Sequence, residues 1–140
     1  MSEQIKTISA EELYYTPISH KESEMIVEHM IPQGLTILAG AAKSGKSWLT
    51  LDMGLAVAAG VPFLEKETLR CGVLYFALED TAARLQKRLH RINEDGPPDN
   101  LYLAIECPPL GGGLLDSLND HLKSHPDIRL IIIDTLQMIR

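Results

Sequence analysis

The sequence predicts an α/β fold built on a mainly parallel sheet with helices on both faces. Three observations lead to this prediction. Short apolar runs alternate with segments whose apolar residues recur at helical spacing, which is typical of βαβ units with right-handed crossovers. A glycine-rich turn of the form GxxxxGKS lies between the first apolar run and the first helical segment. Two later apolar runs end in Glu79 and Asp134, and parallel sheets bind ligands at such carboxyl ends.

The chain is expected to begin with an arm. Residues 1–30 are polar and mixed in charge, so we predict an N-terminal arm ahead of a core that spans residues 31–140. A short helix is predicted near residues 10–15, and its two tyrosines are expected to dock on the core. A Pro-Gln-Gly turn then leads into the first predicted strand, residues 35–39, with the sequence Leu-Thr-Ile-Leu-Ala.

The rest of the chain alternates between predicted helices and strands. The helix after the glycine-rich turn is rich in small residues, so we expect it to pack closely on the sheet and to end at Gly60. The apolar run after Gly72 is continuous and rich in β-formers, which predicts a strand covered on both faces. The predicted elements are a helix at 46–59, a strand at 73–78, a helix at 82–92, a strand at 101–105, a helix at 115–122 and a strand at 130–133.

The glycine-rich turn predicts a phosphate-binding loop, Gly40-Ala41-Ala42-Lys43-Ser44-Gly45-Lys46-Ser47. Its glycines let backbone N–H groups converge on a polyphosphate, and the following helix adds its positive end. Lys46 would contact the outer phosphates in binding and catalysis, and the Ser47 hydroxyl would ligate a bridging magnesium. Lys43 either reaches a phosphate or points to solvent, and Trp48 either joins the nucleotide site or packs. ATP and Mg²⁺ are the expected cofactors.

Hydrolysis also needs one group that holds the metal and another that activates water. Asp134 follows four apolar residues, which is the Walker B form, and would bind magnesium with Ser47. The next residue is threonine, so the glutamate that often follows a Walker B aspartate is absent there. Glu79 is the candidate general base, because its strand could lie beside that of Asp134. The alternative, that Glu79 only caps the next helix, fits the two residues after it better.

With its base on the strand beside Walker B, the chain resembles RecA-type ATPases, and in particular the RepA-like ATPases. That family groups a plasmid-encoded hexameric replicative helicase with phage and mobile-element ATPases. The resemblance implies a RecA-like P-loop NTPase fold, a homo-oligomeric, hexameric ring and DNA as a partner. It places Lys46 and Ser47 on phosphate and magnesium, Asp134 on magnesium and Glu79 as the base. It covers about Ile31 to Arg140 and rests on residues 35–40, 43–49, 55–60, 75–80 and 134–137.

The chain departs from the RecA-type pattern after Walker B. RecA-type cores continue there into a strand that lies between the Walker B and loop strands and carries a γ-phosphate sensor, and then into DNA-binding loops. We therefore expect a fold that is incomplete at the C-terminus, with a vacancy beside the loop strand. A fragment of a longer protein, or a chain completed by another subunit, would explain it.

The leading hypothesis for function is ATP hydrolysis coupled to translocation on DNA or to its remodelling. One alternative is a nucleotide-binding module with little or no turnover. Another is a P-loop kinase that phosphorylates a small acceptor. ATP hydrolysis that is stimulated by DNA would distinguish the DNA-coupled ATPase from the binding module and from the kinase.

Charge and hydropathy bear on non-specific nucleic-acid binding, on membrane insertion and on cellular location. A net charge of −6 argues against a surface that coats nucleic acid non-specifically. No apolar run approaches the roughly 20 residues of a membrane helix, and the N-terminus lacks the pattern of a secretory signal, so the cytoplasm is the expected location. The densest basic cluster is expected to be a solvated helix face; it consists of Arg84, Lys87, Arg88 and Arg91.

Neither the cysteines nor the histidines form a convincing metal site. Cys71 and Cys107 lack ligand spacing and are expected to be buried, reduced thiols. His121 and His125 are four residues apart on a predicted helix, but no third ligand is evident. Metal binding by this pair is therefore not expected.

Overall fold

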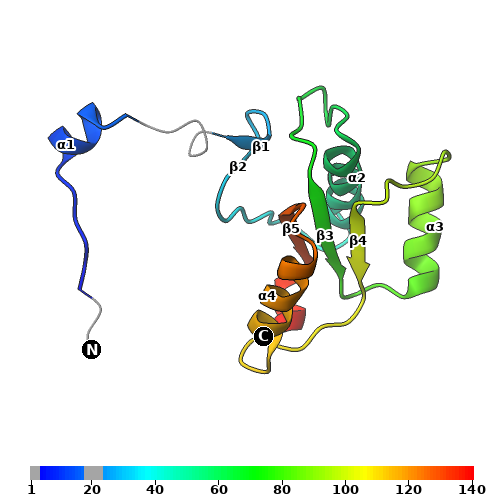
Figure 1. Ribbon diagram of the computed structural model, residues 1–140. Helices are drawn as coiled ribbons and strands as arrows, with labels where there is room; N and C mark the ends of the chain where they lie inside the picture. Colours follow the sequence, from blue (N-terminus) through cyan, green and yellow to red (C-terminus); the bar gives the residue numbers. More distant parts are fainter. Residues whose placement is uncertain (1–3, 18–23) are drawn as a thin grey trace.

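The computed structural model describes residues 4–17 and 24–140 (Figure 1). Its centre is a three-stranded parallel sheet with the strand order β4-β3-β5, and β1 pairs with β2 in a separate antiparallel sheet. The elements are α1 (Ala10–Tyr15), β1 (Met25–Val27), β2 (Ile31–Pro32), α2 (Lys46–Ala59), β3 (Gly72–Ala77), α3 (Ala82–Ile92), β4 (Leu101–Ala104), α4 (Leu114–Ser124), β5 (Ile128–Asp134) and the 3₁₀ helix η1 (Leu136–Ile139).

β3 is the central strand, and every one of its residues is buried. Because side chains alternate along a strand, its residues divide between two cores. Val73 and Tyr75 join a cluster with residues of α2 and α3, whereas Leu74 and Phe76 join a cluster with residues of α4. Helices therefore cover both faces of the parallel sheet, and the predicted α/β fold class is confirmed (Figure 1).

The helices have nearly the bounds that the sequence predicts. α2 begins and ends where expected, and its buried residues include Leu51, Leu55 and Val57. Gly60 ends it in a left-handed conformation, with φ of 73° and its N–H directed at carbonyls of the last helical turn. The strand at 101–105 is one residue shorter than predicted, and the last strand begins two residues earlier and includes Asp134.

The first predicted strand, residues 35–39, does not form. These residues have no regular secondary structure, and Leu35 and Ile37 are 90% and 72% exposed. A strand needs a neighbour for its backbone N–H and C=O groups. In the described part of the chain β5 is an edge strand with β3 as its single partner, and residues 35–39 are not paired with its free edge or with any other strand. The outer edge of β5 is therefore unpaired among the described residues.

The N-terminal helix forms as predicted, but it does not dock. α1 has no buried residue, and Figure 1 shows it apart from the sheet. Tyr14 and Tyr15 are 82% and 76% exposed and contact each other edge to face, so the expectation that they pack on the core is wrong. By contrast Ile26 and Val27, near the end of the predicted arm, are buried in the main core.

Both cysteines are free thiols, as expected. Cys71 is buried, and burial raises the pKa of its thiol, whereas Cys107 is only half-buried. None of the helices within residues 4–17 and 24–140 is long and apolar enough to cross a membrane.

Candidate functional site

The glycine-rich loop is an exposed turn that ends at the first residue of α2. Gly45 precedes the helix in a left-handed conformation with φ of 91°, which other residues adopt only with strain. Lys43 also has a positive φ, 59°. Glycine has no side chain that could cap the helix, so the first N–H groups of α2 are left for another acceptor. Local structure therefore presents a helix N-terminus suited to an anion.

Lys46 folds back over this loop. Its Nζ donates hydrogen bonds to the carbonyl oxygens of Gly40 and Ala41, both at 2.7 Å, and to Ser44 Oγ at 3.3 Å. All three partners are neutral, and Lys46 forms no ion pair with a carboxylate of the described residues. Ala42 and Lys43 complete the exposed rim. The loop thus holds an uncompensated positive charge at its centre.

A buried tyrosine links the start of α2 to Asp134. The hydroxyl of Tyr75, in β3, lies 2.9 Å from Thr50 Oγ1, 3.3 Å from Asp134 Oδ2 and 3.4 Å from the carbonyl oxygen of Ser47. Burial raises the pKa of Tyr75, and the nearby carboxylate of Asp134 raises it further. The sequence analysis missed Tyr75. Its signal was a phenol within a continuous apolar run, because a buried tyrosine hydroxyl requires a partner.

Glu79 lies beside Asp134, as the sequence analysis expected from neighbouring strands. Ala77 of β3 is in register with Asp134 of β5, and the N–H of Leu78 donates to the carbonyl of Asp134 at 2.9 Å. Thr135 Oγ1 donates a hydrogen bond to Glu79 Oε1 at 3.3 Å. The cap of α3 is Thr81 rather than Glu79. The Glu79 carboxylate is therefore free of a capping role and exposed at the carboxyl edge of the sheet.

The turn that carries Glu79 is held by two arginines of α3. Arg88 Nη1 lies 2.6 Å from Asp80 Oδ2, and the Asp80 side chain is only 8% exposed. Arg84 donates to the carbonyl of Glu79 at 3.2 Å. The Arg88 guanidinium also lies over the Trp48 ring, 5.3 Å from its centroid. Trp48 therefore has a packing partner in the structure.

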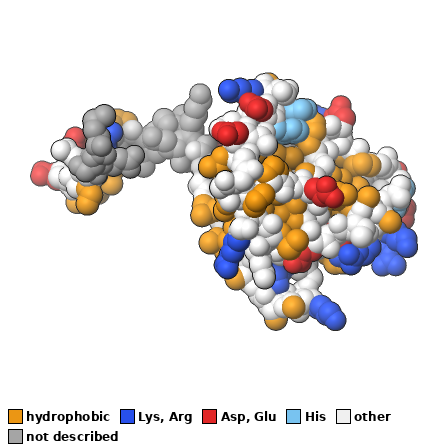
Figure 2. Space-filling model, turned by 90° about the horizontal axis from the view of Figure 1, so that it is seen from below, with side chains coloured by type: hydrophobic (Ala, Val, Ile, Leu, Met, Phe, Trp, Pro, Cys, Tyr) orange, Lys and Arg blue, Asp and Glu red, His pale blue; other side chains and the backbone are white. Residues whose placement is uncertain are grey.

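The prediction that the basic cluster of α3 is a solvated face is confirmed for three of its four members. Arg84 lies 3.9 Å from Asp80 but its side chain is 62% exposed, whereas Arg88 is 23% exposed and pairs with Asp80 at 2.6 Å. Lys87 and Arg91 are exposed. Figure 2 shows Lys and Arg side chains gathered on the side of the molecule that carries α3.

The donor set at the sheet edge fits a magnesium ion. A serine hydroxyl and a carboxylate are the hard oxygen ligands that Mg²⁺ prefers. The Tyr75 hydroxyl lies 3.3 Å from Asp134 Oδ2 and 3.4 Å from the backbone carbonyl oxygen of Ser47, so it connects the residue that carries the serine hydroxyl to the carboxylate. Within residues 4–17 and 24–140 no group of three or more His, Cys, Asp or Glu side chains could hold a metal.

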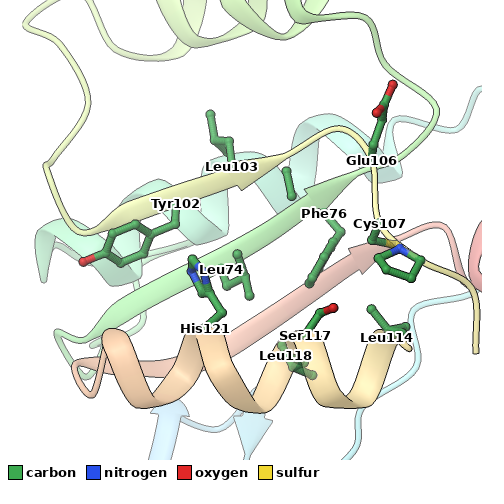
Figure 3. Close-up of a pocket in the computed structure, with 12 residues that line it drawn as sticks. Leu74, Phe76, Tyr102, Leu103, Glu106, Cys107, Leu114, Ser117, Leu118 and His121 are labelled. Carbon is green, nitrogen blue, oxygen red and sulfur yellow. The ribbon is translucent and has the colours of Figure 1, made fainter. Parts of the chain in front are cut away.

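A shallow hollow lies elsewhere on the molecule. A hollow of about 200 Å³ opens between α4 and the sheet face opposite α2, and its lining is largely apolar (Figure 3). Phe76 and Leu74 of β3 point toward α4, which contributes Leu118 and His121. His121 stacks on His125 at 4.3 Å, and this pair has no third candidate ligand among the described residues. The site of interest is thus the exposed sheet edge.

Comparison with known proteins agrees with this geometry. A family model described as an AAA domain matches residues 9–140, nearly the whole chain. No match was found among curated proteins or among solved structures. The family is P-loop ATPase-like, consistent with a glycine-rich loop at the start of a helix beside a parallel sheet. The chain belongs to this family of AAA domains.

Proposed function

We propose that the chain is the nucleotide-binding core of a RepA-like ATPase. In this proposal it binds ATP with Mg²⁺, assembles into a homo-oligomeric ring, and couples hydrolysis to translocation on DNA or to its remodelling. The observation that supports the nucleotide site is that Glu79, in the turn after β3, and Asp134, at the end of β5, follow neighbouring parallel strands, with Tyr75 joining Asp134 to the start of the loop helix. The division into an arm of residues 1–30 and a core of residues 31–140 is part of the proposal.

Each side chain of the site has a distinct role in this proposal. Residues 40–45 offer backbone N–H groups to phosphate oxygens, and Lys46 exchanges its neutral carbonyl partners for an anionic ligand. Ser47 and Asp134 hold magnesium, which neutralises phosphate charge when bound. Glu79 orients the attacking water and accepts its proton. The hydrogen bond from Thr135 Oγ1 ties the Glu79 carboxylate to the residue that follows Asp134.

Two substitutions test the roles of Lys46 and Glu79. Lys46→Ala removes the charged donor and is expected to weaken binding of a fluorescent ATP analogue by about tenfold or more. Glu79→Gln keeps the shape but not the base, so binding should persist while single-turnover phosphate release slows by about 10²-fold to 10⁴-fold. Equal phosphate release by Glu79→Gln and the unsubstituted chain would refute the base assignment.

The chain offers matched controls for both substitutions. Lys87→Ala removes an exposed lysine of α3. Glu106→Gln alters an exposed glutamate that follows β4 at the same spacing as Glu79 follows β3. Both controls should leave binding and phosphate release unchanged.

The proposed coupling to DNA and the proposed assembly into a ring require separate measurements. Phosphate release should rise when single-stranded or duplex DNA is added, and light scattering should show a nucleotide-dependent oligomer. Tight nucleotide binding without phosphate release under any of these conditions would instead support a binding module. Phosphoryl transfer to a small-molecule acceptor without DNA stimulation would favour a kinase.

A further inference from the structure

We infer that Tyr75 is a positioning residue that holds the Asp134 carboxylate in the orientation required for magnesium-dependent nucleotide binding. The inference rests on the proposed function, and it adds a residue outside the loop and outside the two acidic positions. Its basis is a single buried hydroxyl that contacts α2 and β5 from the middle of β3.

The hydrogen bonds of this hydroxyl have a preferred direction of donation. Tyr75 has one proton to donate, and its candidate acceptors are Thr50 Oγ1 at 2.9 Å, the Asp134 carboxylate at 3.3 Å and the Ser47 carbonyl at 3.4 Å. An ionised carboxylate is the stronger acceptor. Thr50 also has one proton, and its candidate acceptors are the Tyr75 oxygen at 2.9 Å and the carbonyl oxygens of Lys46 at 3.0 Å and Ser47 at 3.3 Å. In the relay that directs a proton at the carboxylate, Thr50 donates to Tyr75 and Tyr75 donates to Asp134.

This relay restricts the Asp134 side chain. The contact engages Oδ2, which leaves the second carboxylate oxygen as the ligand for a cation or its water. Magnesium requires near-ideal octahedral geometry, so a carboxylate that rotates freely binds it less well. Partners behind a metal ligand typically change metal affinity by about 10-fold to 100-fold when removed. Removal of the Tyr75 hydroxyl should therefore weaken the magnesium-dependent part of nucleotide binding and leave the magnesium-independent part unchanged.

Packing alone is the competing explanation for a tyrosine here. The ring belongs to the main core, where Tyr75 is 2% exposed. Tyr75→Phe separates the two roles, because it keeps the ring in the core and removes only the hydroxyl. A matched control exists on β4, where the Tyr102 hydroxyl donates to Asp127 Oδ2 at 3.1 Å. Tyr102→Phe removes the same type of bond. Tyr102 is not part of the glycine-rich loop, and it is neither one of the two acids, Glu79 and Asp134, nor one of their hydrogen-bond partners.

The experiment measures binding of a fluorescent ADP analogue in EDTA and across a magnesium titration. For Tyr75→Phe, the magnesium concentration at half-maximal binding should rise by roughly tenfold. Affinity in EDTA should change by less than about twofold, since the phosphate contacts of the loop remain. Tyr102→Phe should match the unsubstituted chain in both measurements. An unchanged magnesium midpoint in folded Tyr75→Phe would overturn the inference, as would a loss of affinity that is equal in EDTA and in magnesium.

Two further variants keep the test decisive. Asp134→Asn removes the carboxylate, so adding Tyr75→Phe to it should raise the magnesium midpoint no further if Tyr75 acts through Asp134. Should Tyr75→Phe unfold, Thr50→Val removes the first donor of the relay and should shift the midpoint in the same direction by a smaller factor. No shift in Thr50→Val would then count against the relay. If the unsubstituted chain binds nucleotide without magnesium dependence, the proposed metal site itself is wrong, which is a different result from a failure of Tyr75 alone.

Discussion

Gly54, within α2, and Gly60, which ends it, differ in what an added methyl group would meet. At Gly60, φ is +73° and a Cβ would approach the Arg70 side chain to 2.9 Å. At Gly54, within the helix, a Cβ would make ordinary contacts of 3.5 to 3.7 Å with Ile132, Val73 and Tyr75. The close approach of helix and sheet that the sequence predicts thus needs a small residue at position 54, but it does not need glycine.

We therefore expect opposite effects of alanine at these positions. Gly54→Ala should leave the free energy of unfolding unchanged or raise it by up to about 1 kcal/mol, because alanine is the better helix former. Gly60→Ala should lower it by about 1–2 kcal/mol, because the left-handed conformation becomes strained. Urea denaturation followed by circular dichroism measures both. A larger loss for Gly54→Ala than for Gly60→Ala would contradict the packing described for α2.

At the scale of elements, the turn after β3 depends on α3. Asp80 is nearly buried beside Arg88, and Arg84 reaches the same carboxylate from 3.9 Å. Removing one partner of such an ion pair leaves the other charge without its main partner in a poorly solvated environment. Because Glu79 directly precedes Asp80, the same contacts fix where the candidate base leaves the strand.

Arg88→Ala is accordingly expected to lower the free energy of unfolding by about 2 kcal/mol. The double variant Asp80→Ala, Arg88→Ala should recover part of that loss, since no unpaired carboxylate remains. Arg91→Ala, on the exposed face of the same helix, is the control and should change stability by less than about 0.5 kcal/mol. Equal losses for Arg88→Ala and Arg91→Ala would show that the ion pair contributes nothing.

Elements with local start and stop signals were predicted well. α2 lies between Gly45 and Gly60, which both adopt left-handed conformations, and α3 begins after Thr81, whose side chain accepts a hydrogen bond from the N–H of Arg84. These signals act within a few residues, so a sequence displays them. The strand predicted at 35–39 failed because strand formation depends on a neighbouring strand, which is not a local property.

At the scale of the whole molecule, apolar surface gathers near the free edge of the sheet. Leu35 and Ile37 are highly exposed, as are Leu136 and Met138 after β5. Figure 2 shows hydrophobic side chains exposed across the face seen from below. An unpaired strand edge with exposed apolar residues promotes association between chains. The isolated chain should therefore self-associate as its concentration rises.

Ile37→Lys tests this expectation. It should reduce the concentration-dependent light scattering, while the melting temperature stays the same within about 2 °C, because the side chain is largely in solvent. Ile8→Lys is the matched control, since Ile8 is also exposed but lies in the arm, and it should leave scattering unchanged. A marked fall in the melting temperature of Ile37→Lys would mean that residues 35–39 are packed in solution.

The sequence by itself determined the fold class, the phosphate-loop motif, the helix boundaries and the two acids at strand ends. Each of these follows from spacing or chemistry within a short stretch, and parallel topology was enough to bring Glu79 and Asp134 to one edge. Only the tertiary structure decided that Tyr75 joins Thr50 to Asp134, that Arg88 contacts both Asp80 and Trp48, and that residues 35–39 stay unpaired. Those features depend on contacts between residues far apart in the chain, and on whether a neighbouring strand is present.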